Sequence, residues 1–441
     1  MFLSLFTIAF SASTVFASTW PSPPEQTTIK LSPSEISASR ASAPTLSPTS
    51  NVEGKAFDRI IQIWLENTDY DTAARNSDMK WLATQGILLT NFWALTHPSQ
   101  PNYLAAVGGD THGLDTDDFY AVPANISTIV DALDTKGISW GSYMEGMPFA
   151  GFQGDRYVNQ ENGRNNYVRK HNPLILYDSV TSNATRLSLV KNFTSLDQDI
   201  QRNFIPQWSF ITPNMTSDGH DTGLPHAASW TRNFLTPLLE NKSFNANHTL
   251  ILLTFDENEK YPTQNHVFTL LLGSAIPSAL YGTHDATFYT HYSVLSTVEA
   301  NWGLPSLGRW DCGANIFQLV ANLTSPRYVN WDVETKNLYF NSTYPGPLSK
   351  HRYQAEWPRP ETKEACAAGY GVLEQVKRAW GEGEGGRKYT WPYPVDEASG
   401  NNVGGSATRA GQSVTVASTP SPTSIQFLVS RAVYDAIMSW R

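Results

Sequence analysis

An α/β fold, with a mostly parallel central sheet and helices on both faces, is what this sequence predicts. Short apolar segments of strand length are separated by helix candidates, and strands arranged in this way form a parallel sheet that helices cover on both sides. Two apolar segments, "IIQIWLEN" at 60–67 and "TLILLTFDEN" at 249–258, end in acidic residues. The chain of 441 residues is long enough for one large domain of this kind or for two ordinary ones.

The elements follow in chain order. The strand candidates are apolar runs, namely Arg59–Glu66, Gly86–Phe92, Ile138–Met144, Trp208–Thr212, Thr249–Phe255 and Val267–Leu272. The helix candidates lie between and after them and are Met79–Thr84, Asn102–Val107, Ser127–Lys136, Trp230–Glu240, Tyr289–Trp302 and Ala365–Ala379. Pro101 supports the second helix because proline is favoured in a first helical turn. In such a sheet, ligands bind beyond the carboxyl ends of the strands.

The two ends of the chain differ in composition from its middle. Residues 1–17 form an uncharged, apolar stretch with small residues near its end, which predicts a secretory signal peptide. Residues 18–52 are rich in Ser, Thr and Pro and predict a flexible leader. Residues 381–441 contain "GEGEGG" and "STPSPTS" and predict a loosely attached tail. The folded domain is therefore expected at 53–380.

Acceptor motifs for N-linked glycans agree with secretion to the extracellular space or cell wall. Eight asparagines stand in Asn-x-Ser/Thr without an intervening proline: Asn125, Asn183, Asn192, Asn214, Asn241, Asn247, Asn322 and Asn341. In a secreted chain, Cys312 and Cys366 are best interpreted as one disulfide, with two free buried thiols as the alternative. No later segment approaches eighteen uninterrupted apolar residues, so a transmembrane helix is not expected.

The charge argues against one class of function. The net charge is −9 and no block of Lys or Arg stands out, so binding of nucleic acid is not expected. An acidic protein that handles an anion must supply positive charge locally, from a metal ion or from helix N-termini.

The acidic strand ends predict a metal site. Glu66 and Asn67 follow one strand, and Asp256 and Glu257 follow another. A hard divalent cation prefers such a set of oxygen ligands. Each acid alone is more simply interpreted as part of a solvated loop, but four oxygen-bearing side chains at two matching strand ends favour one shared site.

Ser99, in "THPSQPNYLAAVGG" at 96–109, is the candidate nucleophile. It lies at or near the start of a helix, where its hydroxyl faces backbone N–H groups that also stabilise a phosphate. A cation in contact with this hydroxyl would lower its pKa and make it a nucleophile. A plain helix-capping serine is the alternative.

The sequence resembles the phosphoesterase family of the alkaline-phosphatase superfamily, and within it the secreted fungal acid phosphatases. The resemblance extends over 57–323 and is carried by "WLENTDYD", "THPSQPNYLAAVGG", "KGISWGSYMEGMP", "RKHNPL", "TPNMTSDGHD", "LLTFDEN" and "YSVLSTVEANWGLPSLG". It implies an alkaline-phosphatase-like fold, with 53–380 as the catalytic domain. It also implies hydrolysis of phosphate monoesters through a phosphoserine, assisted by one divalent metal ion.

Roles for individual residues follow from the same resemblance. The metal ligands of the family match Glu66, Asn67, Asp256 and Glu257, which are the four residues named above. Ser99 matches the nucleophile, and Asn102 matches an amide that holds a phosphate oxygen. His171 and His220 match active-site histidines that bind phosphate or protonate the leaving alcohol.

One segment departs from the family pattern. This chain has "TFDENEKYPTQNHV" at 254–267, where many relatives carry a glycine-rich acidic loop. The roles of His266 and His97, and the presence of a second metal ion, therefore stay open.

Two other functions remain as alternatives. A phospholipase C or phosphodiesterase of the same family would need an apolar groove for its substrate, which nothing in the sequence indicates. A non-catalytic wall glycoprotein would have no use for a nucleophile placed among metal ligands.

Overall fold

The predicted first strand, β1 (Arg59–Leu65), lies in the middle of an eight-stranded sheet. The structure is a computed structural model of the whole chain, and it describes residues 32–42, 46–158, 163–363, 366, 370–381, 389, 391, 406–409 and 412–415. Six of the seven β1 residues are buried, because the strand has a neighbour on each side and helices on both faces.

The strands of this sheet run in an order that brings distant segments together. From edge to edge they are β11 (Thr283–Asp285), β2 (Ile87–Leu89), β10 (Thr269–Leu272), β9 (Thr249–Phe255), β1, β8 (Trp208–Thr212), β4 (Trp140–Met144) and β7 (Val190–Asn192). Only β10 pairs antiparallel with its neighbours among these eight strands. The prediction of a mostly parallel α/β sheet is therefore confirmed.

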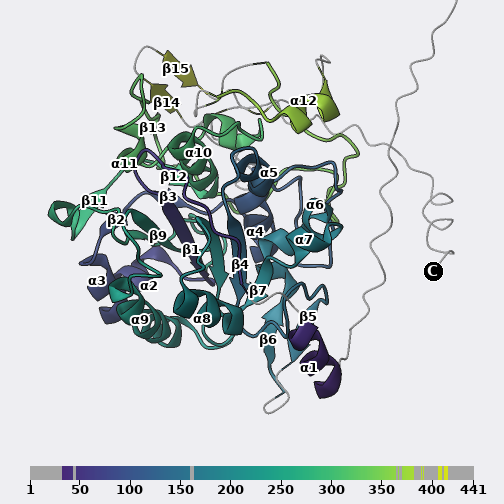
Figure 1. Cartoon of the computed structure of the whole chain (residues 1–441). Coiled ribbons are helices and arrows are strands. Elements are labelled where there is room, and N and C mark those ends of the chain that lie inside the picture. Colours follow the sequence, from purple (N-terminus) through teal and green to yellow (C-terminus); the bar gives the residue numbers. More distant parts are fainter. Residues whose placement is uncertain are drawn as a thin grey trace, which may run out of the picture.

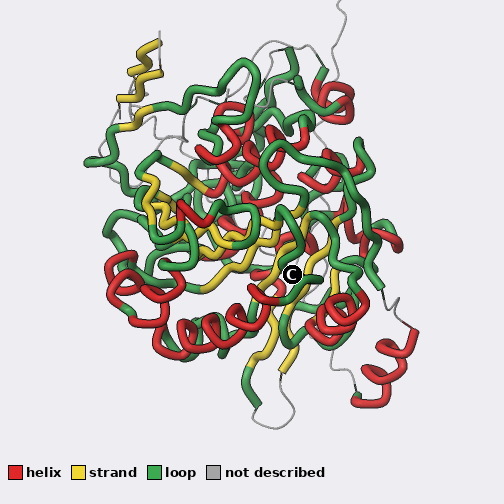
Figure 2. The backbone as a smooth tube through the Cα atoms, turned by 60° about the vertical axis from the view of Figure 1, so that its left-hand side comes forward, coloured by secondary structure: helices red, strands yellow, loops and turns green. Residues whose placement is uncertain are grey.

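Helices cover the sheet on two faces, as Figures 1 and 2 show. On one side lie α4 (Ser99–Gly108), α5 (Ile129–Asp134) and α10 (His291–Trp302), and on the other α2 (Tyr70–Arg75), α3 (Ser77–Ala83), α8 (Phe193–Arg202) and α9 (Leu224–Glu240). The remaining helices are α1 (Pro33–Ser42), α6 (Asp178–Thr181), α7 (Ala184–Leu187), α11 (Gln318–Ala321) and α12 (Glu374–Trp380). Short 3₁₀ helices occur at Arg169–His171, Pro173–Leu176, Ser278–Leu280 and Trp310–Gly313.

Helix α4 is buried along its whole length, which fixes its position against the sheet. At its end, a Cβ added to Gly108 would lie 1.8 Å from the Tyr177 hydroxyl, so only glycine allows this approach. Gly109 then ends the helix with φ 73°, a left-handed conformation that glycine adopts without strain. The Tyr177 hydroxyl donates to the carbonyl of Leu104, 2.8 Å away, and ties the helix to the following segment.

Several predicted elements have different bounds in the structure. The predicted strand Gly86–Phe92 is divided into β2 and β3 (Phe92–Trp93), because Thr90 and Asn91 leave the sheet at a turn. Helix α9 begins at Leu224, six residues before the prediction, with a proline in its first turn. In the predicted helix Ala365–Ala379, only the part from Glu374 is helical among the described residues.

Small sheets and a disulfide complete the domain. The small sheets are β3–β12 (Tyr289–Thr290), β5–β6 (Arg156–Val158 and Asn165–Val168) and β13–β14–β15 (Asp332–Val333, Ser406–Arg409 and Gln412–Thr415). Thus Tyr289 and Thr290, predicted as the start of a helix, belong to a strand. Cys312 and Cys366 form the predicted disulfide, with Cα atoms 4.4 Å apart and a sequence separation of 54.

The expected flexible leader is fixed in place near its end. The Ser47 hydroxyl and backbone N–H donate to the buried Asp199 carboxylate at 2.7 and 3.1 Å. The backbone of Val52 exchanges two hydrogen bonds of 2.8 Å with the side chain of Gln207. Composition alone predicts a loose segment, but these buried partners bind the last residues of the leader to the domain. The predicted signal peptide lies outside the described residues.

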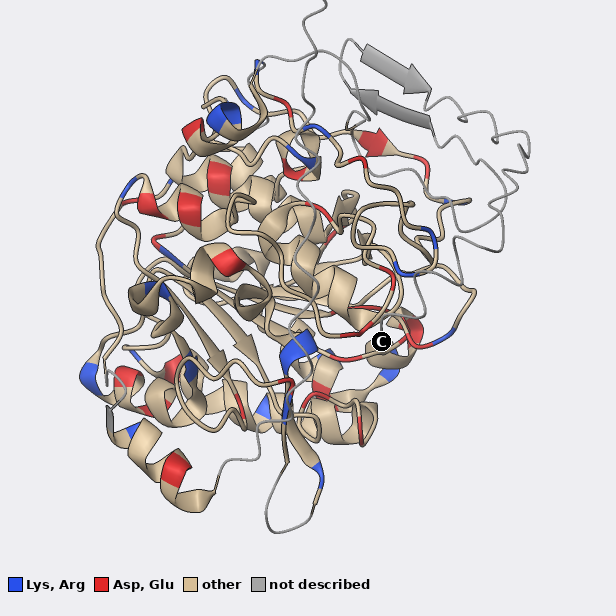
Figure 3. Cartoon of the chain, turned by 90° about the vertical axis from the view of Figure 1, so that its right-hand side faces the viewer, with Lys and Arg blue, Asp and Glu red and all other residues tan. Residues whose placement is uncertain are grey.

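Charge and hydropathy of the described residues add two facts. Figure 3 shows acidic and basic residues interspersed along the ribbon. Among the helices of the described chain, none is both long and apolar enough to cross a lipid bilayer.

Candidate active site

The acids that follow β1 and β9 lie side by side at the carboxyl edge of the sheet. The register pairs Leu65 with Phe255, and the N–H of Asp256 donates to the carbonyl of Leu65 at 3.0 Å. The Asn67 N–H donates to Asp256 Oδ1 at 3.1 Å, and its side-chain amide donates to Glu257 Oε1 at 2.7 Å. The structure therefore brings together all four residues of the predicted metal site.

Ser99 is the first residue of α4, and its hydroxyl is directed at these acids. Its Oγ lies 3.2 Å from Glu66 Oε2 and 3.4 Å from Glu257 Oε1, and the residue is 2% exposed. The hydroxyl does not cap its own helix. Instead, Asp117 Oδ1 accepts a hydrogen bond of 3.0 Å from the N–H of Gln100 in the first turn. The Ser99 hydroxyl thus points into the site.

Asn102 and His97 hold the segment that leads into α4. Asn102 Oδ1 accepts from the N–H of Leu95 at 2.9 Å, and its Nδ2 donates to the carbonyl of Thr96 at 2.8 Å. The same Nδ2 is 3.3 Å from Glu257 Oε2. His97 Nδ1 is 3.0 Å from that oxygen as well. Both side chains therefore fix Glu257 and the turn that precedes Ser99.

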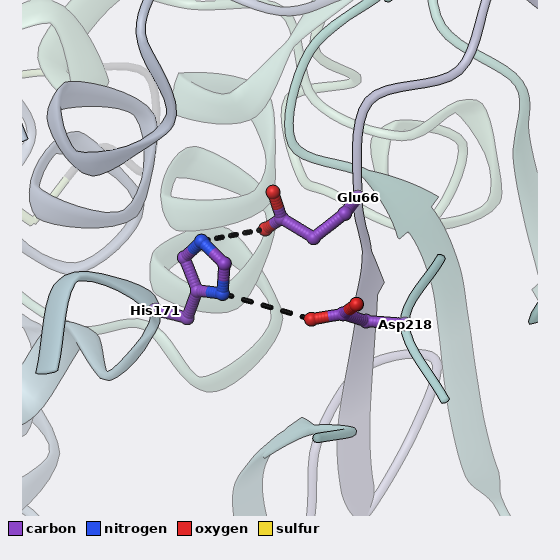
Figure 4. Close-up of side chains that lie close together, drawn as sticks. All are labelled: Glu66, His171 and Asp218. Carbon is purple, nitrogen blue, oxygen red and sulfur yellow. Dashed lines mark ion pairs between the residues drawn. The ribbon is translucent and has the colours of Figure 1, made fainter. Parts of the chain in front are cut away.

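Glu66 has two oxygens with different surroundings. Oε2 faces Ser99, whereas Oε1 accepts a 2.7 Å hydrogen bond from the Tyr103 hydroxyl and lies 3.2 Å from His171 Nε2. On its other side, His171 Nδ1 is 3.6 Å from Asp218 Oδ2. Figure 4 shows the imidazole between the two carboxylates. Glu66 thus connects the serine to a second group of ligand-type side chains.

Burial dominates the electrostatics of the site. It raises the pKa of Glu66, Asp218, Asp256 and Glu257, and for Asp218 and Asp256 the charge of Glu66 raises the pKa further. Burial lowers the pKa of His171 well below its ordinary value, and the charges of Lys170 and His220 act in the same direction. Without a bound cation, the site therefore favours neutral carboxyl groups and a neutral imidazole.

The donor set suits a divalent metal ion. One possible ligand atom comes from each of Glu66, His171 and Asp218. These three atoms lie within 4.8 Å of one another. His171 Nε2, Asp218 Oδ2 and Asp256 Oδ2 are buried without a hydrogen-bond partner. Buried polar atoms usually have partners, and a cation held by Glu66, His171 and Asp218 would supply one to this group. The residues present thus fit a metal ion.

Charged and polar residues form the rim of the site. Lys170 Nζ pairs with Asp117 Oδ2 at 2.8 Å, and its side chain is 18% exposed. Although burial would lower the pKa of Lys170, the charges of Asp117 and Glu66 raise it, so it stays cationic. His220 Nδ1 is 3.0 Å from Asp221 Oδ1, and its ring centroid is 5.8 Å from that of His171.

Asp218 is the main residue that the sequence prediction missed. It lies in the quoted motif "TPNMTSDGHD", six residues after β8, and its carbonyl accepts from the N–H of Glu66 at 3.0 Å. The rule that drew attention to Glu66 and Asp256, an acid directly after a central strand, does not cover it, because a loop separates Asp218 from β8. His266 lies away from these acids, because its Nε2 contacts the carbonyl of Thr90 and its ring stacks on Tyr70.

Known proteins agree with the resemblance. The sequence profile of the phosphoesterase family matches residues 64–305. An acid phosphatase of Aspergillus fumigatus is 54% identical over 92% of this chain and 90% of its own length. A phosphate-repressible acid phosphatase of Penicillium chrysogenum is 54% identical over 84% of this chain and 89% of its own length. A solved structure of an alkaline phosphatase superfamily protein from Vibrio parahaemolyticus has a TM-score of 0.36 and 11% identity, over 62% of this chain and 71% of that one. From the family match and the two fungal relatives, we conclude that this chain belongs to the phosphoesterase family.

Proposed function

We propose that this protein is a secreted acid phosphatase that hydrolyses phosphate monoesters through a phosphoserine at Ser99. One observation carries the proposal: the Ser99 hydroxyl is buried within 3.4 Å of two carboxylates at the carboxyl edge of the sheet. Relatives named acid phosphatases, similar over most of the chain, support the reaction class. Residues 1–17 and the glycan acceptor motifs support secretion.

In the first step, Ser99 Oγ attacks phosphorus and forms a P–O bond while the bond to the ester oxygen breaks. The hydroxyl proton passes to a neighbouring carboxylate, for which Glu66 Oε2 and Glu257 Oε1 are in reach. The leaving alcohol takes a proton from His220, which is on the rim with its side chain 35% exposed. Water then attacks phosphorus and gives a proton to His220, the bond to Oγ breaks as the protonated carboxyl returns its proton to Oγ, and inorganic phosphate leaves.

Glu66, His171 and Asp218 would hold one divalent metal ion, with Asn67, Asp256 and Glu257 as the further ligands expected from the sequence. When bound, such an ion lowers the pKa of the serine hydroxyl and offsets charge on the phosphate oxygens. Lys170 supplies further positive charge at the rim. Asn102 supports the turn before Ser99, and its expected contact with a phosphate oxygen remains a prediction.

The nucleophile is tested by Ser99→Ala, with Ser296→Ala as the control. Ser296 is another buried helical serine, and its hydroxyl donates to the carbonyl of Asp311, away from the site. We expect Ser99→Ala to lose several powers of ten in kcat with p-nitrophenyl phosphate, and Ser296→Ala to stay near the parent. Acid quenching should trap phosphate on the parent and not on Ser99→Ala. Activity of Ser99→Ala within tenfold of the parent would remove the serine from the mechanism.

The ligand set is tested by elemental analysis of purified, folded variants. Asp218→Asn and Asp256→Asn should each lower metal content and rate, whereas Glu334→Gln, at an exposed acid, should change neither. If only Asp218→Asn loses metal, the ion lies among Glu66, His171 and Asp218. If only Asp256→Asn loses metal, the ligand set expected from the sequence, which is Glu66, Asn67, Asp256 and Glu257, is preferred. Full occupancy in both variants would contradict a metal role for either carboxylate.

The same assays separate the alternatives. A phospholipase C or phosphodiesterase would hydrolyse p-nitrophenylphosphorylcholine in preference to p-nitrophenyl phosphate. A wall glycoprotein without catalytic function would hydrolyse neither, and Ser99→Ala would then be indistinguishable from the parent.

A further inference from the structure

The segment that departs from the family pattern is a rigid loop at the rim of the site. It connects β9 to β10, and Asp69 holds its first part. Asp69 Oδ1 accepts from the N–H groups of Glu259 and Lys260 at 3.2 and 3.1 Å, and Oδ2 pairs with Lys260 Nζ at 2.6 Å. Asn258 fixes the same turn from within, because its Nδ2 donates to the carbonyl of Lys260 at 3.0 Å and to Thr263 Oγ1 at 2.8 Å. The residue between these anchors, Tyr261, therefore has a defined position.

Tyr261 exposes an aromatic ring beside the catalytic acids. The residue is 55% exposed, and its ring centroid lies 3.7 Å from that of His97. His97 in turn contacts Glu257, which is 3.4 Å from Ser99 Oγ. Partial burial and the charges of Glu257 and Asp256 raise the pKa of Tyr261, in agreement with this proximity. The ring thus packs against His97 beside the site, while about half of the residue is open to solvent.

The leaving group of a phosphate ester must occupy this rim. In an in-line displacement, the attacking and leaving oxygens lie on opposite sides of phosphorus. Because Ser99 is buried at the base of the site, the leaving group extends away from it, toward solvent. Among the large exposed apolar side chains of the described residues, Tyr261 is the one with a ring contact to a side chain of the site.

We propose that Tyr261 is a specificity-determining residue that stacks on planar aromatic leaving groups and so favours aromatic over aliphatic phosphate monoesters. The inference rests on the proposed phosphatase function. Aromatic stacking of this kind corresponds to a three- to tenfold preference, roughly. The planar group could be an aryl ester or the base of a nucleoside monophosphate, which share this chemistry.

The test compares kcat/KM for 2-naphthyl phosphate, adenosine 5′-monophosphate and glycerol phosphate, using the full-length, metal-loaded protein. Tyr261→Ala should lose about three- to tenfold more with an aromatic substrate than with glycerol phosphate, and Tyr261→Phe should restore the preference because the ring suffices. Tyr281→Ala, at a 43% exposed tyrosine after the 3₁₀ helix Ser278–Leu280, is the matched control and should leave all three values unchanged. For each substrate, kcat/KM of the variant is divided by kcat/KM of the parent. This ratio removes the differences in leaving-group reactivity between the substrates.

The outcomes are distinct. A selective loss with naphthyl phosphate assigns an aryl ester, and a selective loss with the nucleotide assigns a nucleobase; either supports the proposal. An equal loss with all three substrates would mean that Tyr261 supports the reacting centre, and no loss would mean that the ring binds nothing; both overturn it. If the parent hydrolyses none of the three, the proposed function itself fails, and the role of Tyr261 fails with it.

Discussion

Replacing Tyr103 with phenylalanine should impair the site through a single lost hydrogen bond. The Tyr103 hydroxyl donates to Glu66 Oε1 at 2.7 Å. Burial and the charge of Glu66 raise the pKa of Tyr103 well above its ordinary value, so the hydroxyl is a donor at every working pH. The ring is packed against Trp64 and His171, with centroids 5.2 and 5.1 Å away, and phenylalanine keeps these contacts.

The size of the effect follows from the charge of the acceptor. A hydrogen bond to a charged group contributes about 1.5–3 kcal/mol, and its loss also leaves a buried oxygen with one fewer donor. Partners that orient metal ligands typically change metal affinity or activity by about 10–100-fold. We therefore expect Tyr103→Phe to lower kcat/KM for p-nitrophenyl phosphate, and metal affinity, within that range, because Glu66 is no longer held in its orientation.

Tyr177→Phe is the matched control. It removes a hydroxyl from an equally buried tyrosine that also bonds to α4, but its acceptor is the neutral carbonyl of Leu104. This change should lower the free energy of unfolding by about 1 kcal/mol and leave kcat/KM within twofold. The measurements are urea unfolding, metal titration and steady-state kinetics on both variants. The reasoning would be refuted by a Tyr103→Phe protein with parental metal affinity and rate, or by equal loss of activity in the two variants.

Three further predictions concern stability and modification. Burial lowers the pKa of His112 to about 4, whereas its pKa in the unfolded chain is about 6.5. As the pH falls, the unfolded state therefore binds a proton before the folded state does. The free energy of unfolding should fall by about 2–3 kcal/mol between pH 7 and 4.5. His112→Asn, which suits the φ of 51° at this position, should flatten that pH dependence in urea unfolding; an unchanged slope would exclude His112 as its source. Reduction of Cys312–Cys366, which closes a 54-residue separation, should lower the free energy of unfolding by about 4 kcal/mol in the chain-entropy model, and a midpoint that is insensitive to reductant would contradict this. Mass spectrometry of glycopeptides should find a glycan on Asn125, which is exposed, and none on Asn192. Asn192 is 7% exposed, and its side-chain amide donates to the carbonyl of Met147. A glycan on Asn192 in the folded protein would show that this packing does not form.

The sequence predicted the fold, and the proximity of the acids that follow β1 and β9, for a common reason. Parallel strands that end at one edge must bring the following residues together, so Glu66 and Asp256 could be paired without coordinates. Asp218 follows β8 through a loop, and the sequence does not show how that loop folds back to the end of β1. Tyr103 carries no sequence signal of function, because an aromatic residue in a buried helix is ordinarily part of the core.

The ends of the chain show a second limit of prediction from the sequence. Serine- and proline-rich composition indicates a segment that cannot form its own core. Composition does not reveal that the domain supplies buried partners, as Asp199 does for Ser47. Among the described residues of the helix predicted at Ala365–Ala379, the helix begins at Glu374, because Gly371 has a φ of 73°, which lies outside the helical region.

The central position of β1 has a consequence for synthesis of the protein. β1 is the first strand of the sheet to be translated, yet both of its hydrogen-bonded neighbours, β8 and β9, come much later in the chain. At a usual translation rate of roughly 5–20 residues per second, the apolar segment "RIIQIWL" stays without those partners for on the order of ten seconds. During that time the nascent chain presents an unpaired, hydrophobic strand, which is prone to aggregate. A chaperone that covers this segment until β9 is complete should therefore increase the yield of folded protein.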